Sequence, residues 1–181
     1  MRLLSSRLLA LALLAAAAAA CGEGITDVSS PSLPSRRLLR GDELAAVQLV
    51  QCPSGATQLD ALGIVSTRGG DIDGDQTRVH VPIAAVDENT GIAVFTPASE
   101  FMEVEFSAGG AAHYTFDRLI TVQIDYSRCP ASSITSHSAL RVVYIDPETK
   151  QPLEDMGGLV DSVARTITFE TGHFSSYAVA D

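Results

Sequence analysis

Short runs of β-forming residues, each bounded by turn residues, follow one another along most of this chain and constrain its fold more than any other feature. Apolar and polar residues alternate within several runs, as in 121–126, where Val122 and Ile124 share one face. Such strands bury one face and expose the other, and many short strands indicate a sandwich or a barrel. The expected strands are 45–52, 61–66, 77–83, 91–95, 101–106, 113–116, 119–126, 140–145, 165–169 and 175–179.

The segments between these runs have turn chemistry, with Gly-Gly at 69–70 and Asp-Pro-Glu-Thr-Lys at 146–150. No segment after residue 42 sustains a helical period, apart from a short turn near 42–46. We therefore predict an all-β fold, an antiparallel β-sandwich of immunoglobulin-like architecture.

The first 20 residues have the order of a secretory signal. Arg2 and Arg7 precede the apolar stretch 8–20, which ends in small residues before Cys21. A transmembrane helix needs about 20 apolar residues, so we expect an export signal rather than a permanent span. Residues 21–41, rich in Ser, Pro and Gly, are predicted to form a flexible stalk.

Residues 42–181 have the size of one domain. The chain carries 12 basic and 22 acidic residues, and loss of Arg2 and Arg7 with the signal leaves ten basic residues and a formal charge of −12. Such a charge argues against binding to nucleic acid, which needs a basic patch.

Three cysteines occur, at positions 21, 52 and 129. Outside the cytoplasm cysteines tend to be paired or modified rather than free. Cys52 and Cys129 both lie in the predicted domain, so we expect them to form a structural disulfide. Cys21 is then left over.

The small residues at 18–20, directly before Cys21, resemble a lipobox, where the lipoprotein signal peptidase cleaves before a diacylated cysteine. The resemblance implies that Cys21 carries two or three acyl chains, enough for stable anchoring in the lipid bilayer. The alternative is ordinary cleavage that leaves a free thiol, but lipidation accounts for the odd cysteine. Gly22 resembles the residue found there in outer-membrane lipoproteins, so we expect a cell-envelope location with the outer membrane favoured over the inner.

Three segments of the predicted domain, Gly69-Gly70, the run 79–86 and the closing run 166–179, resemble the zonula-occludens and netrin-receptor (ZU) domain and its bacterial relatives. In that family a Gly-Gly turn leads into a strand, and the last strand is often His-Phe-Ser-x-Tyr-Ala-Val. Here Ala84 stands where glycine is common in the corner after the strand. The resemblance implies a ZU-like sandwich that serves contacts or assembly, with no common enzymology.

The same resemblance draws attention to His173, Phe174 and Ser175. In some ZU proteins this tripeptide cuts itself between Phe and Ser: the hydroxyl attacks the preceding carbonyl, and water hydrolyses the resulting ester. The reaction needs the Ser175 nucleophile, a base such as His173, and a strained peptide bond. We favour a structural role instead, an edge strand whose Phe174 and Tyr177 pack in the core, because cleavage would free only residues 175–181.

Asp71, Asp73 and Asp75 alternate along the chain and could offer oxygen ligands to calcium. An EF-hand loop would require glycine where Gln76 stands and glutamate where Pro82 stands. A turn between two strands is therefore the preferred interpretation.

The remaining pattern favours a protein without a catalytic site or cofactor, because it contains neither a Gly-x-Ser-x-Gly elbow nor histidines at metal-ligand spacing. We expect a binding or assembly module whose partners are the bilayer, through Cys21, and an envelope protein or glycan. Two alternatives stay open. One is self-processing between Phe174 and Ser175, and the other is a carbohydrate-active or hydrolytic sandwich with a carboxylate site.

Overall fold

The computed structural model describes residue 33 and residues 37–38, 40–44 and 46–181. These belong to one compact unit, Leu33–Asp181. The expected signal peptide, Cys21 and most of the expected stalk lie outside the described residues. In the part that is described, every helix falls short of the length and hydropathy needed to cross a membrane.

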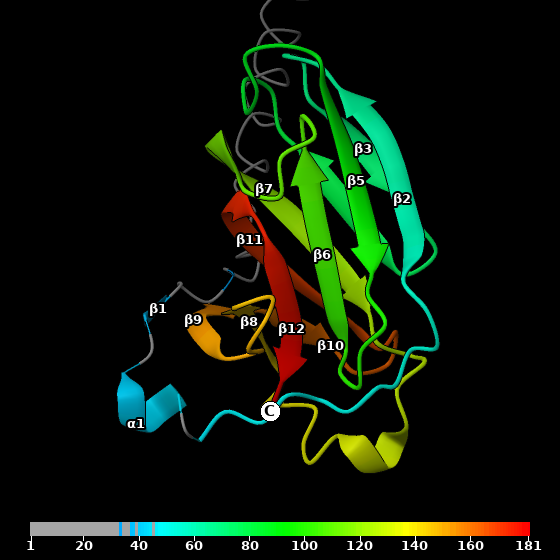
Figure 1. Ribbon diagram of the computed structural model, residues 1–181, viewed down its shortest axis with the longest axis vertical. Coiled ribbons are helices and arrows are strands. Elements are labelled where there is room, and N and C mark those ends of the chain that lie inside the picture. Colours follow the sequence, from blue (N-terminus) through cyan, green and yellow to red (C-terminus); the bar gives the residue numbers. More distant parts are fainter. Residues whose placement is uncertain (1–32, 34–36, 39, 45) are drawn as a thin grey trace, which may run out of the picture. The chain divides into compact units, whose positions relative to one another are not determined.

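The described chain folds as a β-sandwich of two antiparallel sheets packed against each other, which confirms the predicted all-β class (Figure 1). The larger sheet has the order β1 (Arg37–Leu38), β9 (Pro152–Gly157), β8 (Arg141–Ile145), β12 (Ser176–Ala180), β6 (Glu103–Ala108), β5 (Thr90–Thr96), β2 (Gln58–Val65). The smaller sheet has the order β10 (Leu159–Asp161), β11 (Thr166–Phe174), β7 (Tyr114–Asp125), β4 (Thr77–Val81), β3 (Gly70–Asp73). Two short helical segments, α1 (Gly41–Leu44) and the 3-10 turn η1 (Ala131–Ser133), lie outside the sheets.

The core lies between the sheets and follows from the alternation within the strands. Val79 on β4 is opposite Val122 on β7, which in turn is opposite Phe169 on β11, and all three side chains are fully buried. Phe106 of the larger sheet stacks on Phe174 with ring centroids 4.7 Å apart. Burying such side chains contributes about 1.5–3 kcal/mol each, and this layer holds the sheets together.

Several expected element boundaries are wrong, and each differs for a tertiary reason. The runs 113–116 and 119–126 form the single long strand β7, which is flanked on both sides by partners. The run 45–52 forms only isolated bridges, at Leu49 and Gln51. Strand β3 was expected as a turn, and β9 and β10 were not among the expected strands. Their Gly, Asp and Pro content lowers local β propensity, and pairing with neighbouring strands makes them strands.

Strand β12 holds a central position rather than the expected edge position. It pairs with β8 on one side and β6 on the other, and all five of its residues are buried. Its outer face carries Ala178 and Ala180, which join a small second cluster that Val47 and Leu49 cover. The C-terminal strand is therefore an integral part of the larger sheet.

Candidate functional site

The tripeptide of His173, Phe174 and Ser175 lies where the chain passes from one sheet to the other. Strand β11 of the smaller sheet ends at Phe174, a bend at Ser175 follows, and β12 of the larger sheet begins at Ser176. Phe174 is fully buried, stacked on Phe106 and in edge contact with Phe116. This packing fixes the residue on the N-terminal side of the expected scissile bond.

A polar network anchors this crossover from inside the sandwich. The Tyr177 hydroxyl lies 2.5 Å from the His173 carbonyl oxygen, 2.8 Å from Thr171 Oγ1 and 3.2 Å from His173 Nδ1. Thr171 and Tyr177 are completely buried. Because a buried hydroxyl is costly unless it is hydrogen-bonded, the network stabilises one conformation of the crossover.

The geometry of the crossover shows what His173 and Ser175 do in this conformation. The His173 ring nitrogen contacts Tyr177, and its ring packs against those of His113 and Tyr144 with centroids 5.6 and 5.2 Å away. The Ser175 carbonyl accepts a hydrogen bond from the Phe106 amide. None of the described non-glycine residues with positive φ belongs to this tripeptide. The contacts of His173 and Ser175 therefore hold the corner at which the chain passes between the two sheets.

Asp71 and Asp73 lie on the solvent face of β3, and each pairs with a side chain on the neighbouring strand β4. Asp71 Oδ1 is 2.7 Å from Nδ1 of His80, and Asp73 forms an ion pair with Arg78. Ile72 between them is buried in the core, so the alternation of the strand places both carboxylates on the outer face of the smaller sheet, each opposite its partner on β4. The third aspartate, Asp75, lies in the β3–β4 turn and belongs to neither strand.

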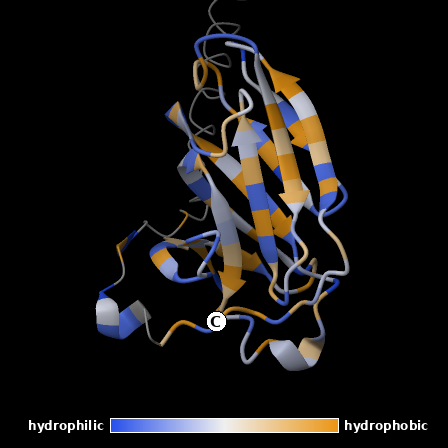
Figure 2. Cartoon of the chain, viewed as in Figure 1, coloured by the Kyte–Doolittle hydropathy of each residue, from blue (hydrophilic) through white to orange (hydrophobic). Residues whose placement is uncertain are grey.

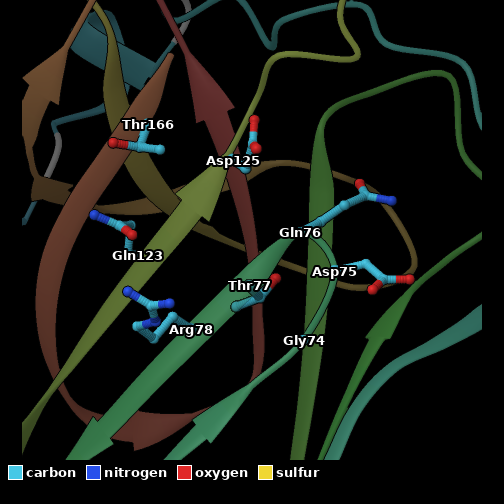
Figure 3. Close-up of a pocket in the computed structure, with 8 residues that line it drawn as sticks. All are labelled: Gly74, Asp75, Gln76, Thr77, Arg78, Gln123, Asp125 and Thr166. Carbon is cyan, nitrogen blue, oxygen red and sulfur yellow. The ribbon is translucent and has the colours of Figure 1, made fainter. Parts of the chain in front are cut away.

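Asp75 lines a small polar pocket of about 150 Å³, together with Gln76, Thr77 and Asp125 (Figure 3). The carboxylates of Asp75 and Asp125 point in different directions, and Asp125 already accepts a hydrogen bond from the Ser127 amide. Across the described residues, no three His, Cys, Asp or Glu side chains are placed to hold a metal ion. The structure thus does not bring Asp71, Asp73 and Asp75 together.

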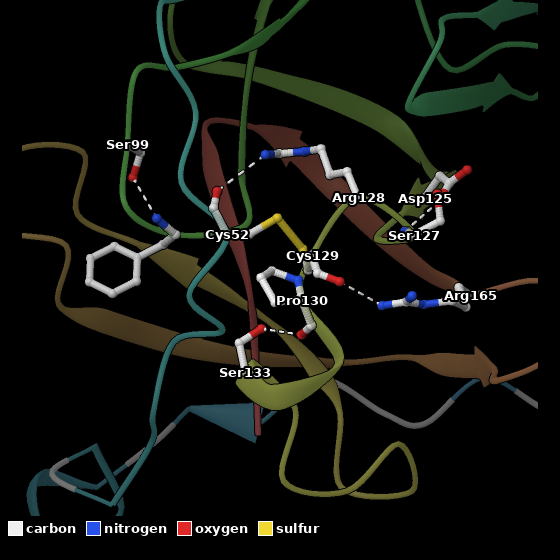
Figure 4. Close-up of a disulfide and its surroundings, with 10 residues drawn as sticks. Cys52, Ser99, Asp125, Ser127, Arg128, Cys129, Pro130, Ser133 and Arg165 are labelled. Carbon is white, nitrogen blue, oxygen red and sulfur yellow. Dashed lines mark hydrogen bonds between the residues drawn. A yellow bond between two sulfur atoms is a disulfide. The ribbon is translucent and has the colours of Figure 1, made fainter.

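The expected disulfide is present between Cys52 and Cys129, with Cα atoms 4.7 Å apart (Figure 4). It ties the segment before β2 to the segment after β7, and both cysteines are buried. Arginine side chains bind the carbonyls of both: Arg128 donates to that of Cys52 and Arg165 to that of Cys129. Burial lowers the pKa of Arg128 from its usual value, although the Asp60 carboxylate opposes this shift.

Strand β2, at one edge of the larger sheet, is hydrophobic over much of its length (Figure 2). Three of its aliphatic side chains are exposed. We call Leu59, Leu62 and Ile64 the β2 strip; their exposed fractions are 54%, 69% and 78%. The half-buried Phe95 of β5 lies opposite Leu59 and extends the strip across the outer face. Contiguous exposed aliphatic side chains of this kind mark contact sites more often than isolated ones do.

The sequence reasoning missed the β2 strip, although a signal for it exists. Apolar residues occupy both alternating sets of positions in 59–65, a pattern typical of strands covered on both faces. In the structure Ala61 and Val65 are buried, while Leu62 and Ile64 face outward. Leu59 lies beyond a register shift between Leu59 and Ala61 and is exposed as well. No known family model and no curated protein matches the chain.

Proposed function

We propose that this protein is a lipid-anchored, extracytoplasmic lipoprotein whose β-sandwich is a non-catalytic binding module of the cell envelope. Its partner is an extended segment of another envelope protein, which adds to the free edge of β2. The observation that carries the binding role is the β2 strip on an edge strand.

The edge position supports strand addition as the mode of binding. Among the described strands β2 pairs only with β5, so the backbone groups along its other edge have no ladder partner. An extended peptide that adds to such an edge gains backbone hydrogen bonds, and its alternate side chains contact those of the strand. Proteins usually protect an exposed edge with charged residues or proline, and the second half of β2, from Leu62 to Val65, contains neither.

Charge supports a protein partner in the same place. The chain has a net charge of −10, which repels other acidic proteins at most of its surface. The one charged residue of β2, Asp60, accepts a hydrogen bond from the Gln76 amide. The β2 strip is therefore an uncharged surface on which apolar contact and backbone pairing outweigh repulsion, and it suits an extended peptide better than a glycan.

The support for the anchor comes from the sequence: the basic and apolar order of residues 1–20 and the small residues before Cys21. A tether there would hold the sandwich near the bilayer and raise its effective concentration toward partners in the same membrane. Replacement of Cys21 by serine should move the protein from the membrane to the soluble extracytoplasmic fraction. An unacylated wild-type chain, measured by intact mass, would overturn the anchor.

The binding role is tested by photo-crosslinking in the native membrane. A photoreactive residue at position 64 should give a discrete adduct with one other protein, whereas the same residue at position 163, which is 94% exposed at the β10–β11 turn, should not. The substitution Leu62→Asp should abolish the adduct from position 64. No adduct, an adduct only with a second copy of this chain, or an adduct only with lipid would each overturn the proposal.

A further inference from the structure

A hollow of about 590 Å³ opens beside the β2–β3 turn and the end of β4, and its lining includes none of the residues of the β2 strip. Two arginines line it, Arg68 from the turn and Arg118 from β7, along with Pro82, Ile83 and the Asp71–His80 pair. We propose that this hollow binds a small ligand in which a phosphate or carboxylate group is attached to an apolar group.

The two arginines are uncommitted, unlike most cations of this acidic protein. Arg78, Arg141 and Lys150 form ion pairs, and Arg128 and Arg165 bind main-chain carbonyls. In the described part of the chain, the guanidinium groups of Arg68 and Arg118 form no hydrogen bond or ion pair. With 22 acidic residues to choose from, two free guanidinium groups at one hollow leave their donors available to a ligand.

The backbone holds both arginines in place. Gly69, next to Arg68, has a φ of +80°, and a Cβ at that position would lie 2.3 Å from the Val81 carbonyl oxygen, so the turn is tightly seated. On the Arg68 side, the Thr67 carbonyl accepts a hydrogen bond from the Ala84 amide.

On the Arg118 side, the neighbouring Asp117 amide donates to the carbonyl of Ala85. Both arginines are thus carried by backbone that is bonded to the same segment, residues 82–85. This shared framework fixes the backbone positions from which the two side chains extend, so ligand binding need not order the backbone.

The rest of the lining defines the ligand. His80 is already paired with Asp71, so the arginines supply the unpaired positive charge. Ile83 is 67% exposed and lies with Pro82 in the same hollow, which gives an apolar surface beside the charged one. A guanidinium group offers a planar fork that matches the oxygens of phosphate or carboxylate, and the aliphatic surface accepts an attached alkyl group.

The test is titration calorimetry on the full chain in neutral detergent, with inorganic phosphate, acetate, butyl phosphate and butyrate as probes. Saturable binding of at least one oxyanion is expected, tighter with the butyl group and weaker as salt is added. Arg68→Ala and Arg118→Ala should each weaken it roughly tenfold or more, because a charged hydrogen bond is lost. Arg68→Lys should fall between, since lysine keeps the charge without the fork.

Arg40→Ala is the matched control, because Arg40 is exposed and lies outside the hollow. Co-sedimentation of the Cys21→Ser chain with phosphatidylcholine vesicles, made with and without phosphatidic acid, separates the two sources of the anion. Binding to vesicles as well as to butyl phosphate identifies a lipid headgroup, and binding to the small probes alone identifies a free ligand. Absence of saturable binding to any probe, or an Arg40→Ala loss as large as that of Arg68→Ala, would overturn the proposal.

Discussion

The hydroxyl of Tyr177 donates a hydrogen bond to the carbonyl of His173, four residues earlier, across the bend that joins the two sheets. A tyrosine that bonds back to upstream backbone is a device of Greek-key sandwiches, where it fixes a corner between strands. Here the corner is the junction of β11 and β12, so one hydroxyl ties the end of a strand in the smaller sheet to a strand in the larger sheet.

The first prediction concerns this hydroxyl. Tyr177→Phe should lower the free energy of unfolding by about 1–3 kcal/mol, because Thr171 and the His173 carbonyl lose a buried partner. Tyr114→Phe is the control, since the Tyr114 hydroxyl forms no hydrogen bond in the described part of the chain. Urea unfolding followed by circular dichroism measures both, and equal losses would contradict the role given to Tyr177.

The second prediction is that the chain stays uncut between Phe174 and Ser175. His173 Nδ1 contacts Tyr177, and the residue before the bond is fixed by aromatic stacking, so the corner is held as a structural element. The intact mass after denaturation should correspond to a single chain that still carries residues 175–181. Two fragments that separate at this bond, and that disappear in Ser175→Ala, would establish self-processing instead.

The third prediction concerns the disulfide. Cys52 and Cys129 are 77 residues apart, and a cross-link of that span restricts the unfolded chain by on the order of 4 kcal/mol. The double substitution Cys52→Ala with Cys129→Ala should lower stability toward urea by about that amount. Because both cysteines are buried, reductant should act on the wild type mainly when the chain opens. A reductant that leaves the wild-type unfolding curve unchanged would argue against a stabilising role.

The alternation of residues predicted most of the long strands and many of their buried side chains, as for Val122 and Ile124, because this information is local. It missed the strands β3, β9 and β10, which depend on pairing with neighbours. The order of the strands depends on pairings between distant segments, which no local pattern contains. The run 175–179 was expected at an edge, but apolar residues at every position from Tyr177 to Ala180 are typical of a strand covered on both faces. That signal was present in the sequence but was not used.

The candidate site residues also divide into those that the sequence alone predicts and those that depend on the fold. The cysteine pair was predicted from the cysteine count and from the oxidising compartment that the N-terminal sequence leads us to expect. The aspartates were placed in a loop, because Gly-Asp sequences form strands poorly, and only pairing with β4 puts Asp71 and Asp73 beside His80 and Arg78. The free state of Arg68 and Arg118 could not be predicted, since it depends on which carboxylates the fold places within reach.

The fourth prediction concerns pH. Hydrogen bonds from the Thr149 and Glu148 amides hold the pKa of the Asp146 carboxyl below its ordinary value of 3.8. A group whose pKa is lower in the folded state stabilises the fold above its unfolded pKa, and this contribution is lost as pH falls below about 4 toward the folded value. Asp146→Asn should therefore flatten the loss of stability over that acidic range, measured by thermal melts. Asp87→Asn, at an exposed loop position, controls for the change in net charge, and equal profiles for both variants would contradict the prediction.

The last prediction concerns the buried ion pair on the outer face of the larger sheet. Glu103 has a completely buried side chain, and its Oε1 lies 2.5 Å from Nζ of Lys150 in the β8–β9 turn. Its other oxygen, Oε2, has no hydrogen-bond partner among the residues that the structure describes. Lys150→Met should therefore destabilise the protein by about 3 kcal/mol, because it leaves a buried carboxylate without its counter-charge.

The double variant Glu103→Leu with Lys150→Met should recover most of that loss, since an apolar pair can replace a buried ion pair at little net cost. Arg78→Met breaks the exposed pair with Asp73 and is the matched control, expected to cost less than about 1 kcal/mol. All four chains are compared by urea unfolding at neutral pH. If Lys150→Met lowers the free energy of unfolding no more than Arg78→Met does, the Glu103–Lys150 pair is as well screened by solvent as the exposed pair, which contradicts the prediction. If the double variant is no more stable than Lys150→Met, the loss arises from packing of the lysine side chain and not from the stranded carboxylate.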